Sequence, residues 1–334
     1  MIQYFNELKN LIEDNYEITV LNIMKFKNVY KIIGVEGNFC LKQFKYDFYR
    51  LKHILEIFNY LIEESFENIL EIIPTLSGRK YVQLNDIYFY MTEWIESREL
   101  NYSNVYDVMR ASQNIAKLHN YSEGFSPNFK MKADIRWGRW IEIFDKKISD
   151  IYNFKKFIQE KERNSIFDKI YLENLDENIF IANESIENLK KYDYEKIVKS
   201  HEKKGYICHH DLANHNILID SRNKIYFIDF DYVILDSFLH DLGSFIARVL
   251  KYGRWTTDKF KMIINSYKDV KSLSKNETSL ALSFILFPND FWQLGIQYYC
   301  EDINWSEEKF LKRLTRFEND KKSKREFILS MIWN

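Results

Sequence analysis

The chain has 334 residues, of which 46% are hydrophobic and 29% are charged, and its formal net charge is −1. This composition is typical of a globular protein with one or two domains, and the balanced charge excludes the basic surface that nucleic acids or anionic membranes require. No apolar run is long enough to span a bilayer, the first residues lack the apolar segment of a signal peptide, and the 3 cysteines are far apart. We therefore expect synthesis in the cytoplasm, a reducing compartment, no membrane span and no nucleic-acid partner.

Residues 1–95 are predicted to form a small lobe around a β-sheet. Residues 1–15 have the apolar spacing of a short helix, and residues 47–64 have that of a longer one. Apolar runs bounded by turn residues predict six strands, at 18–24, 29–33, 39–44, 72–77, 80–84 and 87–94. The lobe is predicted to end near residue 95, just after the last strand.

Residues 96–334 are predicted to form a larger, mainly helical lobe. Residues 104–119 have apolar or small side chains at helical spacing, and Ser103 is the predicted N-cap. Several charged helices are predicted over residues 134–200, where the charge runs indicate solvated faces.

The stretch from His209 to Asp231 carries the most specific pattern in the chain. It reads H-H-D-L-A-N-H-N from His209 to Asn216, continues as two apolar runs around a polar turn, and ends at Asp229-Phe230-Asp231. The two runs predict a hairpin, which brings the loops at its two ends together. Asp211, Asn216 and Asp229 are then expected to converge, and oxygen-bearing side chains of this kind are suitable ligands for Mg²⁺.

This pattern resembles the catalytic core of the kinase-like phosphotransferases, in which H-R-D-x-x-x-x-N is followed by D-F-G. His210 replaces the arginine and Asp231 replaces the glycine, so the chain looks more like the aminoglycoside phosphotransferase and choline kinase branch, which acts on small molecules. The resemblance implies an α+β, bilobal protein-kinase-like fold with ATP as the phosphoryl donor. It also implies that Asp211 positions or deprotonates the acceptor hydroxyl, while Asn216 and Asp229 hold Mg²⁺ against the ATP phosphates.

The same resemblance implies roles for residues of the smaller lobe. Lys42, in the third predicted strand, would contact the α- and β-phosphates. Glu56, in the following helix, would be the partner of Lys42, with Glu63 as a second candidate. Backbone groups around Glu93 and Ile95, at the hinge between the lobes, would bind adenine.

Three further residues receive supporting roles from the resemblance. Asp241 follows the motif in His240-Asp241-Leu242-Gly243 and would brace the backbone of the catalytic loop. His209 would pack under that loop, and His119, at the end of a predicted helix, would be structural.

The acceptor pocket is expected between Asp211 and the C-terminal helices. Aromatic and acidic residues in the C-terminal part make a cationic acceptor such as an amino sugar or choline conceivable, although helix core is the favoured interpretation for most of the aromatic ones. The residues considered for this lining are Trp255, Trp292, Tyr298, Tyr299, Trp305, Asp231, Asp236, Glu301 and Asp302.

Motifs in the hinge and in the C-terminal part make the family resemblance more specific. The hinge reads E-W-I-E-S-R-E from Glu93 to Glu99, and the tail contains Ser274 with Glu277, F-P-N-D-F-W from Phe287, and Tyr298-Tyr299. In this order, and over nearly the whole chain, these motifs are similar to the CotS-type spore coat proteins, a bacterial branch of the aminoglycoside phosphotransferase-like fold. The resemblance implies deposition in the spore coat, with other spore coat proteins as partners, and leaves the substrate open.

Three alternatives to a small-molecule kinase stay open at this point. A non-catalytic coat scaffold is favoured by the family and by residues 25–28, which contain no glycine where protein kinases have a glycine-rich loop. A protein kinase is disfavoured because no A-P-E-type segment follows Asp229 at the required spacing. A zinc site of His209, His210 and His215 is disfavoured because adjacent side chains at a strand end point apart and no fourth ligand is evident.

Overall fold

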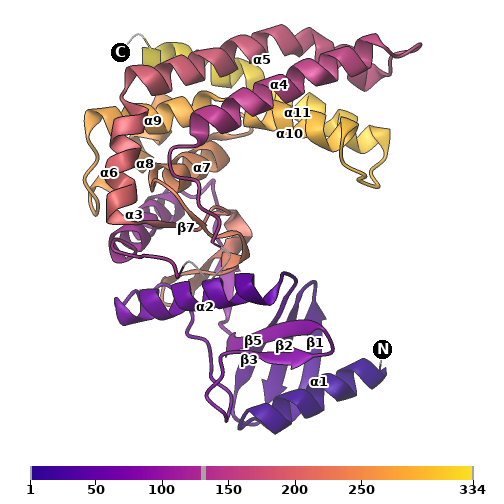
Figure 1. Ribbon diagram of the computed structural model, residues 1–334, viewed down its shortest axis with the longest axis vertical. Helices are drawn as coiled ribbons and strands as arrows, with labels where there is room; N and C mark the ends of the chain where they lie inside the picture. The colour runs from indigo at the N-terminus through magenta and orange to yellow at the C-terminus, as the bar shows by residue number, and fades with distance from the viewer. Residues whose placement is uncertain (1, 129–132, 333–334) are drawn as a thin grey trace.

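The computed structural model describes residues 2–128 and 133–332, which form two lobes (Figure 1). The smaller lobe contains one antiparallel sheet with the strand order β1-β2-β3-β5-β4. Its elements are α1 (Ile2–Asn15), β1 (Val20–Phe26), β2 (Val29–Gly34), β3 (Asn38–Phe44), α2 (Phe48–Glu63), β4 (Val82–Leu84) and β5 (Ile87–Glu93). Together with the mainly helical larger lobe, this sheet confirms the predicted α+β, bilobal fold.

One strand of the smaller lobe is predicted wrongly. The segment 72–77 contributes only an isolated bridge between Ile72 and Thr92. The chain instead closes a turn, in which Thr75 N–H donates to the Arg79 carbonyl at 2.7 Å and Gly78 N–H donates to the Thr75 carbonyl at 2.8 Å. Because these backbone groups bond to each other, they are not available to extend the sheet.

After β5 the chain leaves the five-stranded sheet. The short strand β6 (Ser97–Glu99) pairs with β8 (Ile217–Asp220) and not with the five-stranded sheet. The remaining elements are α3 (Val105–Tyr121), α4 (Trp140–Gln159), α5 (Ile166–Lys191), α6 (Tyr194–Lys204), β7 (Ile207–Cys208), η1 (Asn214–Asn216), β9 (Ile225–Phe227), η2 (Phe230–Tyr232), β10 (Ile234–Leu235), α7 (Leu239–Leu250), α8 (Thr257–Lys268), α9 (Lys275–Leu286), α10 (Asn289–Tyr299) and α11 (Glu307–Ile332). In the part of the chain that the structure describes, no helix has the length and apolar character needed to cross a bilayer.

Helix α3 starts one residue later than predicted. Its N-cap is Asn104, whose side-chain oxygen accepts hydrogen bonds from the N–H groups of Tyr106 and Asp107. Ser103 lies outside the helix, and its N–H donates to the side chain of Asn101 at 2.9 Å. Both serine and asparagine are good N-caps, so the sequence alone does not separate the two positions.

Aromatic side chains from α4, α5, α10 and α11 pack into a separate core at the far end of the larger lobe. Tyr298 stacks on Phe167 with ring centroids 3.9 Å apart, and the Tyr299 hydroxyl donates to Asp168 at 2.9 Å. Trp292 and Trp305 pack against the same core. The helix-core interpretation of these four aromatic residues is therefore confirmed.

Gly205 connects α6 to β7, the strand that leads into His209. Its φ is +67°, and a Cβ at this position would overlap the carbonyl oxygen of Phe125. Replacing Gly205 by alanine combines left-handed backbone strain with a clash against backbone atoms, so we expect a loss of about 2–4 kcal/mol in the free energy of unfolding in urea. Gly78 is a matched control, because its φ is +79° and no atom lies within 4 Å of the added Cβ. Equal losses in Gly205→Ala and Gly78→Ala would contradict the close approach of the Phe125 backbone.

Candidate active site

The loop from His209 to Asn216 follows β7 and is held by one buried carboxylate. Asp241, in the first turn of α7, accepts hydrogen bonds from the backbone N–H groups of His209 at 2.6 Å and His210 at 2.8 Å. Burial opposes ionisation of Asp241, but the hydrogen bond from His119 and the neighbouring histidines outweigh it and lower its pKa to about 2. His210 has a φ of +69°, so this carboxylate stabilises a backbone turn that L-residues seldom adopt.

The hairpin of β8 and β9 places Asp229 beside this loop. The imidazole Nε2 of His209 lies 2.8 Å from the carbonyl oxygen of Ile228, and Ile228 N–H donates to the carbonyl of Asn216 at 3.0 Å. His209 also packs against the ring of Phe230, with centroids 4.6 Å apart. His209 thus lies buried under the loop, and the two ends of the hairpin are joined directly.

Asp211 and Asn216 form a connected pair in the loop. The side-chain nitrogen of Asn216 donates to the backbone carbonyl of Asp211 at 2.9 Å and to its carboxylate Oδ2 at 3.0 Å. The other carboxylate oxygen accepts from the guanidinium of Arg248 at 2.7 Å. Because the amide nitrogen of Asn216 faces Asp211, its amide oxygen is the atom that remains suitable for a metal ion.

Sequence reasoning missed Arg248. It lies on α7 seven residues after Asp241, which is close to two helical turns, so both residues are on the same face of the helix. The spacing is a signal that sequence reasoning can use, but it becomes informative only once α7 is known to pack against the catalytic-type loop.

Lys42 connects the sheet of the smaller lobe to the acidic end of the hairpin. Its Nζ lies 2.6 Å from Oδ1 of Asp229 and 2.5 Å from Oδ1 of Asp231. The Lys42 and Asp231 side chains are each only 13% exposed. Lys42 is located in β3, opposite Tyr90 of β5, so the register of the sheet directs its ammonium toward the other lobe.

The pKa values of these three groups shift because two carboxylates share one ammonium. Burial opposes the ionised form of each, but the carboxylates raise the pKa of Lys42, and Lys42 holds the pKa of Asp229 below its usual range. The pKa of Asp231 is raised by burial and by the neighbouring charge of Asp229. This cluster of two carboxylates and one ammonium therefore carries a net negative charge.

The expected pairing of Lys42 with Glu56 is wrong. The Glu56 carboxylate accepts from the backbone N–H of Asn128 at 3.2 Å, on another face of α2. It is Arg50 of α2 that contacts the site, donating to the carbonyl oxygens of Asp231 at 3.0 Å and Val233 at 2.7 Å. Because a helix turns about 100° per residue, Glu56 lies roughly 240° around the axis from Arg50 and cannot face the same group.

Residues 93–95 connect the sheet to the larger lobe. Glu93 pairs with Phe39 at the end of β5, and Trp94 N–H donates to the carbonyl of Asn38 at 3.0 Å. The ring of Trp94 lies 5.9 Å from that of Phe26, the last residue of β1, which precedes the glycine-free turn to β2. Adenine binding by the backbone of Glu93 and Ile95 stays a prediction.

The three clustered histidines do not form a zinc site. His209 bonds to the backbone, Nδ1 of His210 lies 2.7 Å from Nε2 of His240, and His215 is exposed. Within the described ranges, the grouping close enough to hold an ion is His119, Cys208 and Asp241. Asp241 already accepts two backbone hydrogen bonds from the loop, so this group has the geometry of a structural core.

A cavity of about 990 Å³ lies between α4, α5, α7, α10 and α11, and Arg248 extends from its wall to Asp211. Of the residues considered for an acceptor pocket, Trp255 and Asp236 line it. Trp292, Tyr298, Tyr299 and Trp305 belong to the helix core, and Asp231 binds Lys42. Eight lysines and arginines line the cavity against five aspartates and glutamates. A cationic acceptor, which the sequence makes conceivable, is not favoured by this basic lining.

Two lobes joined by a hinge, with an Asp/Asn loop and an acidic hairpin at their junction, define the kinase-like fold of the small-molecule phosphotransferases. The structure is similar to an aminoglycoside phosphotransferase from Alicyclobacillus acidocaldarius subsp. acidocaldarius DSM 446, with a TM-score of 0.86, 18% identity, and coverage of 96% of this chain and 94% of that one. The sequence model of the family described as "Spore coat putative kinase YutH" matches residues 9–331. The chain belongs to this family, as the spore coat resemblance predicts.

Two further solved structures have the same fold. Spectinomycin phosphotransferase APH(9)-Ia, in complex with ADP and spectinomycin, matches with a TM-score of 0.66 and 17% identity over 94% of this chain and 93% of that one. Amicoumacin kinase hAmiN, in complex with AMP-PNP, Ca²⁺ and Ami, matches with a TM-score of 0.61 and 12% identity over 97% of this chain and 93% of that one. At these identities the likeness establishes the fold alone.

Proposed function

We propose that the protein is a spore coat-associated phosphotransferase that transfers the γ-phosphoryl group of ATP to a hydroxyl of a small molecule in a Mg²⁺-dependent reaction. The observation that carries the proposal is the meeting of Lys42, from the sheet, with Asp229 and Asp231, beside the Asp211–Asn216 pair. ADP in the spectinomycin phosphotransferase structure and AMP-PNP in the amicoumacin kinase structure support nucleotide use by this fold.

The oxygen ligands present suit Mg²⁺. Asp229 supplies a carboxylate and Asn216 an amide oxygen, which are ligands that a hard cation prefers. The ammonium of Lys42 balances only part of the negative charge of Asp229 and Asp231. Mg²⁺ bound by Asn216 and Asp229 would neutralise charge on the β- and γ-phosphates, and Lys42 would contact the phosphates beside it.

The residues present account for the chemical step. The acceptor oxygen forms a bond to the γ-phosphorus while the bond from that phosphorus to the β–γ bridging oxygen breaks, and ADP leaves with the electron pair. The hydroxyl proton passes to the carboxylate of Asp211, which Arg248 and Asn216 hold in place. Phosphoryl transfer depends mainly on positioning and charge neutralisation, so these groups are sufficient in kind.

Nucleotide binding is the direct test of the proposal. We expect calorimetry to show ATP binding by the wild-type protein that is at least about tenfold tighter with Mg²⁺ than without it. Asp229→Ala should lose this Mg²⁺ dependence because it removes the carboxylate ligand. Asp86→Ala, in the exposed turn between β4 and β5, is the matched control and should bind like wild type. No binding by wild type under either condition would overturn the proposed function.

A non-catalytic coat scaffold is the second candidate. It is favoured by the ion pairs that occupy Lys42 and Asp211 and by the contact of Phe26 with Trp94 where a glycine-rich loop would lie. A scaffold predicts that wild-type and Asp229→Ala proteins restore a coat-deficient strain equally. A phosphotransferase predicts restoration by wild type alone.

A further inference from the structure

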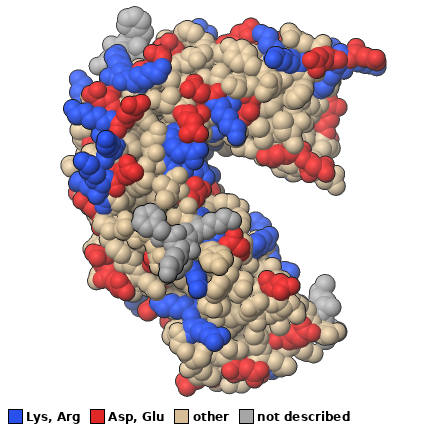
Figure 2. Space-filling view, viewed as in Figure 1, with Lys and Arg blue, Asp and Glu red and all other residues tan. Residues whose placement is uncertain are grey.

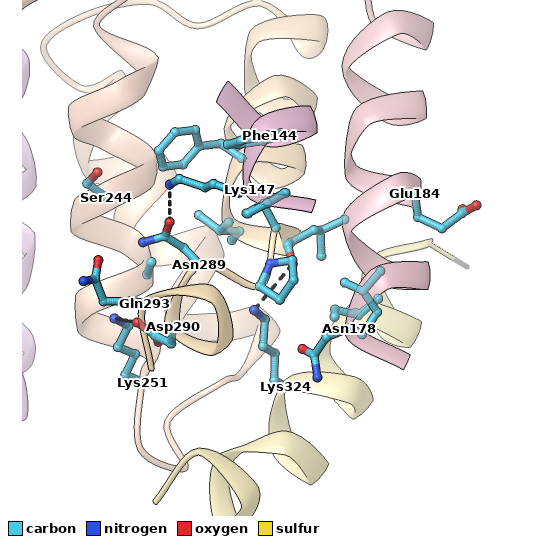
Figure 3. Close-up of a pocket in the computed structure, with 18 of the residues that line it drawn as sticks. Phe144, Lys147, Asn178, Glu184, Ser244, Lys251, Asn289, Asp290, Gln293 and Lys324 are labelled. Carbon is cyan, nitrogen blue, oxygen red and sulfur yellow. Dashed lines mark hydrogen bonds and ion pairs between the residues drawn. The ribbon is translucent and has the colours of Figure 1, made fainter. Parts of the chain in front are cut away.

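The cavity beyond Asp211 is enclosed by helices of the larger lobe. Figure 3 shows Lys147 approaching it from α4 and Lys324 approaching it from α11, while Glu184 on α5 points away. The space-filling view shows a deep hollow on one side of the molecule, with basic and acidic side chains on its wall (Figure 2). A volume of about 990 Å³ is sufficient for a small-molecule ligand.

Lys147 and Lys324 have apolar surroundings and neutral hydrogen-bond partners. Lys147 Nζ donates to the amide oxygen of Asn289 and lies 4.3 Å from the ring centroid of Trp292. Lys324 Nζ lies 3.5 Å from the carbonyl oxygen of Leu286 and 5.2 Å from the ring centroid of Trp255. Considering the described residues alone, neither ammonium has a carboxylate within 4.0 Å.

Partial burial without an ion pair within 4.0 Å to a described residue is unfavourable for these two ammonium groups. Burial is the main cause that lowers the pKa values of both Lys147 and Lys324 to about 8. Lysine is seldom buried unless it is paired, because an isolated charge loses its hydration. Two partly buried ammonium groups on the wall of one cavity favour the binding of a negatively charged ligand.

Three acidic residues of the cavity wall have hydrogen-bond or ion-pair partners. Asp290 forms an ion pair with Lys251 at 2.7 Å. Asp236 accepts from the indole N–H of Trp140 at 2.8 Å, and Asp320 accepts from Gly253 N–H. Asp290 and Asp320 raise the pKa of Lys324, and Asp150 raises that of Lys147, without an ion pair within 4.0 Å among the described residues, so both ammonium groups remain available to an anionic ligand.

We propose that this cavity binds a small hydroxylated anion, a sugar phosphate or sugar acid, with its anionic group at Lys147 and Lys324 and a hydroxyl toward Asp211. This inference deepens the proposed function and rests on it for the identity of the acceptor. Arg248 connects the cavity to the loop that carries Asp211, because it lines the cavity and also donates to the Asp211 carboxylate. The ligand class thus differs from the cationic acceptor that the sequence makes conceivable.

Ligand binding without nucleotide tests the site. Glucose 6-phosphate, gluconate and inorganic phosphate are the anionic probes, and glucose and glucosamine are the neutral and cationic ones. We expect calorimetry to show binding of at least one anion by wild type and a loss of about tenfold or more in affinity in Lys147→Met and in Lys324→Met. The phosphate and carboxylate probes decide between the two sources of the anionic group.

Matched controls lie on the same helices. Lys156→Met on α4 and Lys322→Met on α11 change exposed lysines and should bind the anions like wild type. Thermal melts verify folding, and since methionine removes a buried charge, Lys147→Met and Lys324→Met should melt no lower than wild type. Equal anion binding by all four variants, tighter binding of glucose or glucosamine, or no binding of any anionic probe would overturn the proposal.

Failure of this inference is distinguishable from failure of the proposed function. Lys147→Met and Lys324→Met should still bind ATP with Mg²⁺, because neither side chain belongs to the Lys42–Asp229 cluster. Anion binding without ATP binding would support the anion site in the cavity and contradict the proposed phosphotransferase function. ATP binding without anion binding would support the proposed phosphotransferase function and contradict the proposal of an anionic acceptor.

Discussion

Asp211→Asn is expected to lower the rate of phosphoryl transfer by about 10²- to 10⁴-fold while leaving ATP binding with Mg²⁺ close to that of wild type. The variant keeps the shape of the side chain but removes the group that accepts the hydroxyl proton. It also replaces a charge-assisted contact with Arg248, now at 2.7 Å, by a neutral one. ADP production is measured first with ATP alone, which reports the slow transfer to water, and then with each of the anionic probes.

Asp86→Asn is the matched control for this experiment, because it makes the same chemical change in an exposed turn of the smaller lobe. It should leave ADP production unchanged. If Asp211→Asn reduced ATP binding and transfer by the same factor, the carboxylate would belong to the nucleotide site and not to the acceptor side. Unchanged turnover in Asp211→Asn would contradict its role as the proton acceptor.

Asp241→Ala is expected to have the largest effect on stability, with a loss of about 3–5 kcal/mol in the free energy of unfolding. The substitution leaves the N–H groups of His209 and His210 without their buried acceptor and removes the carboxylate beside His119. Asp241→Asn should be destabilised less, because one amide oxygen replaces one of the two acceptors. Urea denaturation measures both variants, and a loss below about 1 kcal/mol in Asp241→Ala would show that the loop holds its conformation without this brace.

The acid dependence of stability gives a second readout for Asp241. Its pKa in the folded protein is about 2, below its ordinary value of 3.8, so the ionised carboxylate stabilises the fold above about pH 4. This contribution, on the order of 2 kcal/mol, is lost as the pH falls from about 4 to about 2. Asp241→Asn lacks a titrating group, so its stability should change less than that of wild type over this range.

Local patterns in the sequence predict the fold class and the centre of the site. The loop and the hairpin that bring Asp211, Asn216 and Asp229 together are close in the chain, so their geometry follows from strand and turn preferences that act over a few residues. Lys42 is far away in sequence, but its place in the third strand follows from the order of the predicted elements. Adenine binding at Glu93 and Ile95 and the lobe boundary near residue 95 stay predictions.

The sequence determined which residues are candidates for the chemistry, and tertiary structure alone decided their partners. Whether α2 presents Glu56 or Arg50 to the surroundings of Lys42 depends on how the helix is rotated against the larger lobe. Helix packing likewise decides that Arg248 lies beside Asp211. It also brings together the two lysines of the cavity, which come from helices far apart in the chain. Helical periodicity specifies a face, whereas the neighbour of that face is set by the packing of whole elements.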